Sequence, residues 1–247
     1  MMNRDSNAYT FGFAAAMVVV VASVLAFTAS SLKDLQQENV RKEKMQNILA
    51  TIGIETDRDG AEVLFNDHIV SQLALRNDGS VDEDVDPFSG IKLALELKKD
   101  PSEQRFPLYL ANVKEASYYI IPLRGSGLWD AIWGYIALES DRNTIKGAVF
   151  DHKAETAGLG AEITQQWFMN SFVGEKVFDN DGKLVGISVS KTNNDPKDLD
   201  KDDHEVDAIS GATITGDGVS DMIMERLTHY QSYLTKNQTT TAIAVND

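Results

Sequence analysis

The pattern of apolar and polar positions separates a long hydrophobic stretch at the start of the chain from a mixed remainder. No charged side chain occurs between residues 6 and 32, and Phe11 to Phe27 is almost wholly apolar. At about 1.5 Å per helical residue, this stretch and its flanks cross a hydrocarbon core of roughly 30 Å. Arg4 is the only basic residue ahead of it, and no good Ala-x-Ala cleavage site follows. We therefore predict that residues 1–32 hold an uncleaved transmembrane anchor, with residues 10–32 in the membrane.

Residues 33–105 are predicted to form a stalk helix and the N-terminal part of a soluble domain. The helix is expected from Lys33 to about Ala50, with Gly53 closing it. Residues 59–77 mix helix-like and strand-like spacing, and residues 77–87 have the composition of an acidic loop. The apolar residues that share one face of the helix are Leu32, Leu35, Val40, Ile48, Leu49 and Ile52.

Residues 106–234 change to a strand-rich pattern. Short apolar or alternating runs, parted by turn residues, predict strands at 107–114, 118–123, 132–139, 144–150 and 184–191. Two helices are expected between and after them, at 161–172 and from 217 to about 234. Strands in series with inserted helices predict an α+β fold with an antiparallel sheet. The tail from Thr235, rich in Thr, Asn and Gln, is predicted to be disordered.

The amino-acid composition limits the functions that this chain can have. The 247 residues are 43% hydrophobic and 25% charged, as in a globular protein, and the formal net charge is −15. This charge argues against nucleic acid as a partner, because phosphate neutralisation needs clustered Lys and Arg. The chain has no cysteine, which excludes thiolate iron–sulfur ligation, disulfides and cysteine nucleophiles. Redox chemistry in this chain would therefore need an organic cofactor.

Two glycine-rich segments could approach such a cofactor. In the run from Gly125 to Trp129, the glycines let the backbone come close to a flat ligand, and Trp129 could stack on a ring or fill the core. In the run from His152 to Gly160, Glu155 and Thr156 could cap the following helix or hydrogen-bond the edge of a heterocycle.

Two further segments could meet a phosphate. Lys191 is a charged residue at the end of an apolar strand, where it could also face an anionic reduced cofactor. The hydroxyl-rich run from Asp207 to Thr215 precedes a helix, whose N-terminus presents unpaired N–H groups and a partial positive charge. In the simpler interpretation, the hydroxyls of this run only cap the helix.

Other common sites lack support in the sequence. The pairs Asp151-His152 and Asp203-His204 have no further ligands at the spacing of a defined metal site, so no metal is predicted. No Gly-x-Ser-x-Gly, Gly-x-Gly-x-x-Gly or Walker A segment is present. A nucleotide would have to be held in another way, such as covalent attachment.

The run Asp207-Ala208-Ile209-Ser210-Gly211-Ala212-Thr213 resembles the flavinylation motif Asp-x-x-(Ser/Thr)-Gly-Ala-Thr of the FMN-binding domain family. The resemblance implies that a flavin transferase joins FMN to Thr213 through a phosphoester. It also implies that Gly211 and Ala212 leave room around the phosphate, while Asp207 and Ser210 shape the motif for the transferase. The expected further contacts with FMN are Trp129, Glu155, Thr156, Gly158, Leu159, Gly160 and Lys191. Ala208 and Ala157 stand where the family often has Gly and Pro, which concerns loop geometry rather than a reacting group.

The Gly-Leu-Trp129 and Glu155-Thr156-x-Gly-Leu-Gly160 segments, together with the single anchor, are similar to the flavin-carrying subunits of sodium-translocating NADH:quinone reductases. This similarity implies an electron relay that is not active alone. Electrons from NADH would pass through FMN to other subunits and finally to ubiquinone, coupled elsewhere in the complex to Na⁺ transport. Two alternatives remain. The chain could be a G-type subunit of an Rnf complex or a stand-alone membrane flavoprotein, or a non-redox anchored binding module in which Thr213 only caps a helix.

Two indicators in the sequence give opposite predictions for the side of the membrane on which the soluble domain lies. The basic residues Lys33, Arg41, Lys42 and Lys44 follow the anchor, and a simple count favours a cytoplasmic domain. The resemblance implies the opposite, an extracytoplasmic FMN-binding domain in the periplasm of a bacterial inner membrane. We follow the resemblance, because charge rules lose force for long translocated domains.

Overall fold

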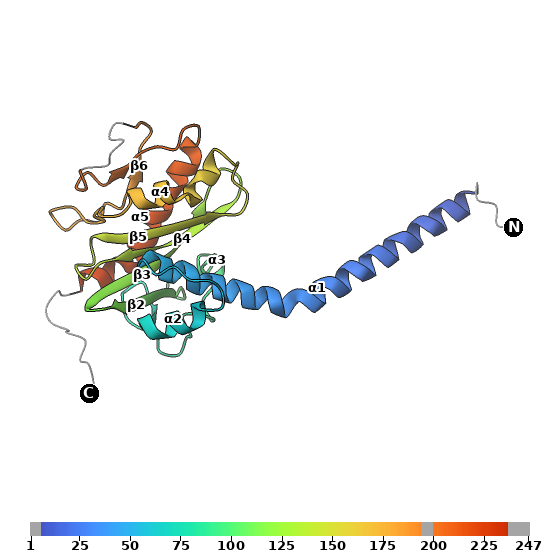
Figure 1. Ribbon diagram of the computed structural model, residues 1–247, viewed down its shortest axis with the longest axis horizontal. Helices are drawn as coiled ribbons and strands as arrows, with labels where there is room; N and C mark the ends of the chain where they lie inside the picture. Colours follow the sequence, from blue (N-terminus) through green and yellow to red (C-terminus); the bar gives the residue numbers. More distant parts are fainter. Residues whose placement is uncertain (1–5, 194–199, 237–247) are drawn as a thin grey trace. The chain divides into compact units, whose positions relative to one another are not determined.

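The computed structural model of the protein describes residues 6–193 and 200–236. Its chain divides into two compact units, residues 1–44 and residues 45–247. The helix α1, Asn7–Thr51, makes up most of the first unit, and its last turns belong to the second (Figure 1). The predicted stalk is therefore not a separate helix, because nothing between Leu32 and Lys33 interrupts the helical backbone.

In the first unit, α1 exposes its apolar side chains. Phe11, Val18, Leu25 and Phe27 are each between 63% and 76% exposed. Within the described residues, α1 is the helix that is long and apolar enough to cross a membrane. Its N-terminal part thus has the length and the apolar surface that the predicted anchor requires.

The second unit contains a five-stranded antiparallel sheet in which the strands are neighbours in sequence order (Figure 1). They are β1 Ile69–Leu75, β2 Phe106–Val113, β3 Ala116–Ser126, β4 Ala131–Leu138 and β5 Ile145–His152. Helices α2, Ala61–His68, and α3, Leu93–Glu96, lie before β1 and β2 in the chain. The predicted α+β fold with an antiparallel sheet is confirmed.

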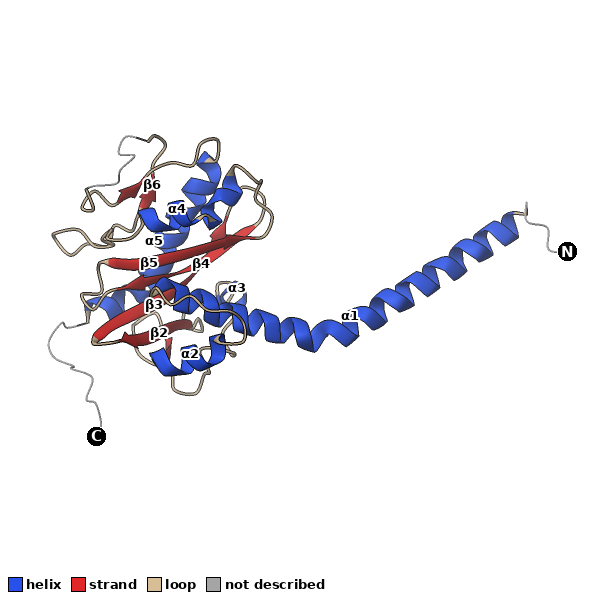
Figure 2. Cartoon of the chain, in the orientation of Figure 1, coloured by secondary structure: helices blue, strands red, loops and turns tan. Residues whose placement is uncertain are grey.

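Alternating side chains of the strands build two hydrophobic cores. In β3, Ile120 packs with the end of α1 and with α2, whereas the next residue, Ile121, packs in the core that includes α5. In β4, Ala137 packs in the core with α1 and α2, and its neighbour Ile136 packs in the core that includes α5. This period of two is expected for a sheet buried on both faces. The sheet therefore lies between helices on either side (Figure 2).

The fifth strand of the sheet is not the one predicted. Residues 69–75 form it, although their mixed spacing favoured no single element. Of the predicted strand 184–191, only Ser188–Val189 is extended as β6, and it pairs in parallel with β7, Glu205–Val206. Burial explains the error, because residues 184–191 supply Leu184, Ile187 and Val189 to the core without joining the main sheet.

The helices after β5 also differ from the prediction. The expected helix 161–172 is a 3₁₀ turn, η1 Gly160–Thr164, followed by α4, Gln166–Ser171. The expected helix from 217 begins earlier, since α5 spans Thr213–Thr235 and contains two glycines. Gly218 is needed for close packing, because a Cβ there would lie 2.3 Å from the carbonyl oxygen of Ser126. The predicted disordered tail, residues 235–247, is wrong at Thr235, which is the last residue of α5, and its residues 237–247 lie outside the described residues.

Candidate functional site

The N-terminus of α5 lacks a side-chain cap. Ala212 occupies the N-cap position, and no side chain accepts a hydrogen bond there. Within the described part of the chain, the N–H groups of Thr213, Ile214 and Thr215 have no acceptor, and the Thr213 hydroxyl has no partner. The interpretation of Thr213 as a helix cap is therefore wrong for this structure. A 23-residue helix instead directs free donors and its positive end at the space before it.

That space is a pocket of about 290 Å³. It joins three segments that are far apart in sequence: the turn between β3 and β4, the loop after β5, and the start of α5. Seven of the predicted site residues line it, together with three residues that were not predicted. The predicted ones are Glu155, Thr156, Leu159, Gly160, Gly211, Ala212 and Thr213, and the additional ones are Leu128, Ile214 and Thr215.

Glu155 connects the three segments. Its Oε1 accepts a hydrogen bond from the Trp129 backbone N–H at 3.0 Å, and its Oε2 accepts one from the Thr215 hydroxyl at 2.6 Å. The side chain is buried, and burial alone would raise its pKa. The hydrogen bonds from Thr215 and from the backbone of residues 128–130 outweigh burial and hold the pKa of Glu155 below its ordinary value. Glu155 is thus an ionised structural link, and it does not cap η1, whose N-cap is Leu159.

Two glycines make room for this carboxylate. A Cβ at Gly127 would lie 2.5 Å from Oε1 of Glu155, and a Cβ at Gly160 would lie 2.5 Å from Oε2 and 2.4 Å from the Thr215 hydroxyl. Contacts below 3.0 Å are not compatible with a real side chain. The sequence indicated that these glycines approach a ligand; in the structure both approach Glu155, and Gly160 also lines the pocket.

The rim of the pocket carries exposed apolar side chains. Trp129 lies next to the lining residue Leu128 but is not itself part of the lining. It is 67% exposed, so the interpretation that it fills the core is wrong, and its indole N–H donates to the Thr156 hydroxyl at 3.2 Å. Leu128, Leu159 and Ile214 are also exposed, and the structure hides none of these large apolar groups. Gly211 has a positive φ of 73° and lies so close to Leu159 that a Cβ would be 2.8 Å from its Cδ2. These features leave apolar surface beside the free hydroxyl of Thr213.

The remaining predicted residues lie outside the lining of the pocket. Asp207 precedes the turn in which the Ala212 N–H donates to the Ile209 carbonyl, and Ser210 lies within that turn. Gly158 has a positive φ of 75° and nothing within 4 Å of a Cβ position. Lys191 is 71% exposed at its side chain, and its Nζ lies 3.8 Å from Oδ2 of Asp217.

Three lining residues were missed from the sequence. Leu128 and Ile214 are direct neighbours of predicted residues, and their exposed apolar side chains were the available signal. Thr215 is the second threonine of the Thr-x-Thr run, and its role depends on Glu155, which the sequence places 60 residues away. Only the fold brings those two residues together.

The fold and the site define the class of an FMN-binding domain. Residues 127–228 match the family described as "FMN-binding domain", a range that includes the β3–β4 turn, the loop after β5 and the start of α5. FMN fits what the structure offers here: an uncapped helix end suits a phosphate, and exposed apolar side chains suit a ring system.

Comparison over whole chains identifies a narrower family within this class. The chain is 31% identical over 246 residues to the NqrC subunit of the Na⁺-translocating NADH-quinone reductase of Pseudomonas aeruginosa, covering 90% of this chain and 92% of that protein. It is 30% identical to the same subunit from Vibrio campbellii, over 88% and 89% of the two chains. The protein belongs to the NqrC family of subunits of the Na⁺-translocating NADH-quinone reductases.

Solved structures agree with this assignment. NqrC from Parabacteroides distasonis superposes with a TM-score of 0.75 at 36% identity, covering 83% of this chain and 98% of that one. NqrC from Shewanella oneidensis gives a TM-score of 0.65 at 26% identity, with 78% and 95% coverage. These comparisons confirm the predicted family, in which the chain is an FMN-binding subunit of the NqrC type.

Proposed function

We propose that the protein carries FMN bound covalently through a phosphoester to Thr213. The observation that carries this proposal is the free Thr213 hydroxyl at the uncapped N-terminus of α5, inside the pocket. A phosphate on that hydroxyl would face the N–H groups of residues 213–215 and the positive end of the helix. Ser210 lies outside the pocket lining, and the Thr215 hydroxyl already donates to Glu155, so both are poorer attachment points.

The residues around Thr213 are proposed to have different roles in holding FMN. Gly211 and Ala212 keep space beside the phosphate, while Leu128, Trp129, Leu159 and Ile214 offer apolar surface to the ring. Bound FMN would supply one- and two-electron redox chemistry, and the protein supplies position and electrostatics. The exposure of Trp129 leaves that side of the site open to a partner. Lys191 and Gly158 are proposed to contribute from the periphery, and Asp207 and Ser210 to present the motif to a flavin transferase.

In this proposal the protein is an electron-relay subunit of a Na⁺-translocating NADH:quinone reductase. It receives electrons that originate from NADH and passes them to other subunits of the complex and finally to ubiquinone. The N-terminal part of α1 anchors it in a bacterial inner membrane, with the FMN domain in the periplasm. Support comes from the match to NqrC relatives along about 90% of the chain and from the single exposed apolar helix segment among the described residues.

Fluorescence of a denaturing gel tests the covalent bond. Wild-type protein, made together with a flavin transferase, is expected to show flavin fluorescence in its band, and Thr213→Ala is expected to be dark. Thr228→Ala is the matched control, because Thr228 is an exposed threonine on the same helix whose hydroxyl bonds only the Met224 carbonyl. Mass spectrometry of the tryptic peptide should place FMN, minus one water, on Thr213.

If the wild-type band shows no flavin fluorescence, the flavin proposal is refuted and a non-redox binding module is favoured. Fluorescence that persists in Thr213→Ala would move the attachment to another residue. Co-purification separates the remaining alternatives: recovery with an NADH-oxidising, Na⁺-pumping complex supports the proposed function, whereas recovery with a ferredoxin-dependent complex would indicate an Rnf-type subunit.

A further inference from the structure

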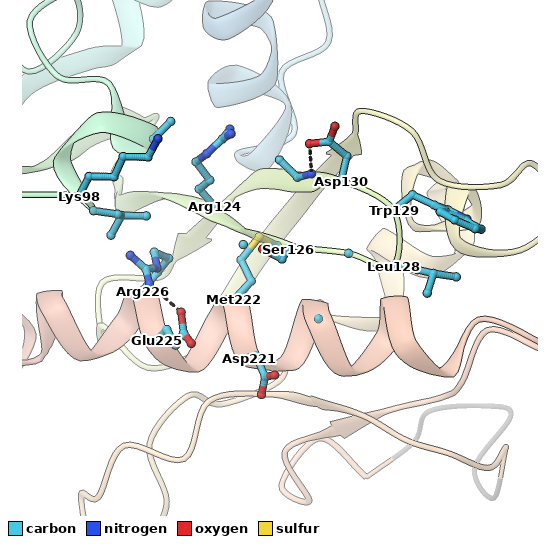
Figure 3. Close-up of a pocket in the computed structure, with 16 residues that line it drawn as sticks. Lys98, Arg124, Ser126, Leu128, Trp129, Asp130, Asp221, Met222, Glu225 and Arg226 are labelled. Atoms are coloured by element: carbon cyan, nitrogen blue, oxygen red, sulfur yellow. Dashed lines mark hydrogen bonds and ion pairs between the residues drawn. The ribbon is translucent and has the colours of Figure 1, made fainter.

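A second and larger pocket, of about 640 Å³, lies between the end of β3, the middle of α5 and the residues around α3 (Figure 3). It shares only Leu128 with the pocket at Thr213, and Thr213 itself is not part of it. The proposed function uses only the Leu128–Trp129 edge of this space. Its floor contains Leu97, Met222 and the glycine backbone of β3, and its charged residues come from all three elements.

Arg226 is the buried charge of this pocket. The residue is only 6% exposed, yet its Nε and Nη1 have no hydrogen-bond partner among the described residues. Only Nη2 is engaged, by Oε2 of the exposed Glu225 at 2.8 Å. A buried guanidinium with two free nitrogens is costly unless another acceptor completes its shell. The side chain is drawn toward the interior of the pocket, on the side of Lys98 and Arg124.

Lys98 and Arg124 add two more cations to the same pocket. Within the described ranges, neither forms an ion pair, although the whole chain has 38 acidic residues against 23 basic ones. The acidic side chains of the lining are mostly engaged elsewhere: Asp130 pairs with Lys153 at 2.8 Å, and Glu225 with Arg226. Asp221 is the remaining carboxylate, and Figure 3 shows it on the opposite side of α5 from the three cations. Arg124 acts on Asp130 through charge alone, and Arg226 uses only one nitrogen for Glu225, so three cations with few direct partners converge on this pocket. In so acidic a protein, this indicates an anion site.

We propose that this pocket binds the phosphate group of a small molecule. One guanidinium satisfies one carboxylate, but two guanidiniums and an ammonium match the larger charge and the three or more acceptor oxygens of a phosphate. Arg226 lines the pocket from α5, and Arg124 and Lys98 line it from the side of β3 and α3. The partly buried Leu97 leaves apolar surface for the remainder of the molecule.

Isothermal titration with inorganic phosphate tests this site on the full chain in detergent, in a chloride buffer of low ionic strength. Wild type is expected to bind phosphate. The double variant Lys98→Gln/Arg124→Gln, at exposed and partly exposed positions, is expected to bind about tenfold more weakly or worse. The matched control, Lys146→Gln/Lys183→Gln, removes the same net charge outside the pocket and should stay within about twofold of wild type.

Two further variants distinguish this site from the other pocket and from a general charge effect. Arg226→Lys keeps the charge but loses the planar fork, so phosphate affinity should fall while the protein remains folded; if it does not fold, the double variant decides. Thr213→Ala should bind phosphate like wild type. No phosphate binding by wild type, an equal loss in both double variants, or a loss in Thr213→Ala would each overturn the proposal.

Discussion

The hydroxyl of Thr215 donates a 2.6 Å hydrogen bond to the buried carboxylate of Glu155, although the two residues are 60 positions apart. The other oxygen of that carboxylate accepts the backbone N–H of Trp129 at 3.0 Å. A single side chain thus joins the start of α5, the loop after β5 and the turn before β4. These are the three segments that line the pocket at Thr213. The shape of the pocket therefore depends on Glu155, even though the residue is engaged with the protein rather than free to bind a ligand.

Glu155→Gln is expected to destabilise the soluble domain by about 1–3 kcal/mol, because a buried carboxylate that accepts several hydrogen bonds is replaced by an amide. Urea unfolding at neutral pH measures the loss. Glu103→Gln, at an exposed position, is the control and should change the free energy of unfolding by less than about 0.5 kcal/mol.

The same pair of proteins tests the ionisation of Glu155. Its pKa is lower in the folded state than its ordinary value of 4.5, so its ionised form stabilises the fold above that value. This contribution is lost as the pH falls through the folded-state pKa. The stability difference between wild type and Glu155→Gln should therefore shrink below about pH 4.5. A difference that stays constant down to pH 3 would show that Glu155 is not held ionised.

Gly160→Ala is expected to lower the melting temperature. The new Cβ would lie 2.4 Å from the Thr215 hydroxyl and 2.5 Å from Glu155, so the hydrogen bond between them must break or shift. Such overpacking costs about 1–3 kcal/mol. Gly12→Ala is the control, because a Cβ at Gly12 meets nothing within 4 Å and its φ is not positive. Equal melting temperatures for Gly160→Ala and wild type, by circular dichroism, would contradict the described packing.

Trp129→Ala should separate stability from the cofactor environment. Because Trp129 is 67% exposed, we expect its removal to change the free energy of unfolding by less than about 1 kcal/mol. If FMN is bound at Thr213, the flavin absorption and fluorescence should nevertheless change. Trp167→Ala, which removes a tryptophan on α4 that is 52% exposed, should leave the flavin spectrum unaltered. Identical flavin spectra for wild type and Trp129→Ala would exclude a contact with the ring.

His229 is expected to make the fold sensitive to mild acid. Burial, and then the charge of Arg226, lower the pKa of His229 to about 4, from an ordinary value of 6.5. Its ring stacks on Phe106 with centroids 4.0 Å apart, and Nδ1 lies 2.8 Å from Oδ1 of Asn77. The unfolded chain therefore binds the proton first as the pH falls from 6.5 to 4, and stability falls with it.

The expected loss of stability is set by the pKa shift of His229. Because the ring is partly exposed, the loss is smaller than the full shift implies and amounts to about 1–2 kcal/mol. Unfolding free energies measured between pH 7 and pH 4 should show the decrease in wild type, and a smaller one in His229→Gln. His68→Gln, at another histidine of the same domain, is the control for the loss of a histidine side chain. An unchanged slope in His229→Gln would refute the assignment.

Much of the fold was predictable from local patterns. The strands β2 to β5 have strong apolar runs with Tyr, Ile and Val, and their predicted positions agree with the structure to within a few residues. The prediction failed where polar and apolar signals conflict. β1 carries Ser71 and Gln72 and joins the sheet only through pairing with β2, while residues 184–191 look like a strand but bury their apolar side chains without joining the main sheet.

The sequence by itself determined the apolar anchor stretch, the α+β class and the Asp207–Thr213 motif, because each depends on residues that are neighbours in the chain. It could not determine why Gly127 and Gly160 are glycines, or that Glu155 is bound on both sides, since those contacts join segments up to 60 residues apart. Nor could it show that Ala212, rather than a hydroxyl residue, holds the cap position of α5. In the folded protein α5 packs against β3 and begins at Thr213, which leaves the hydroxyl of this residue free.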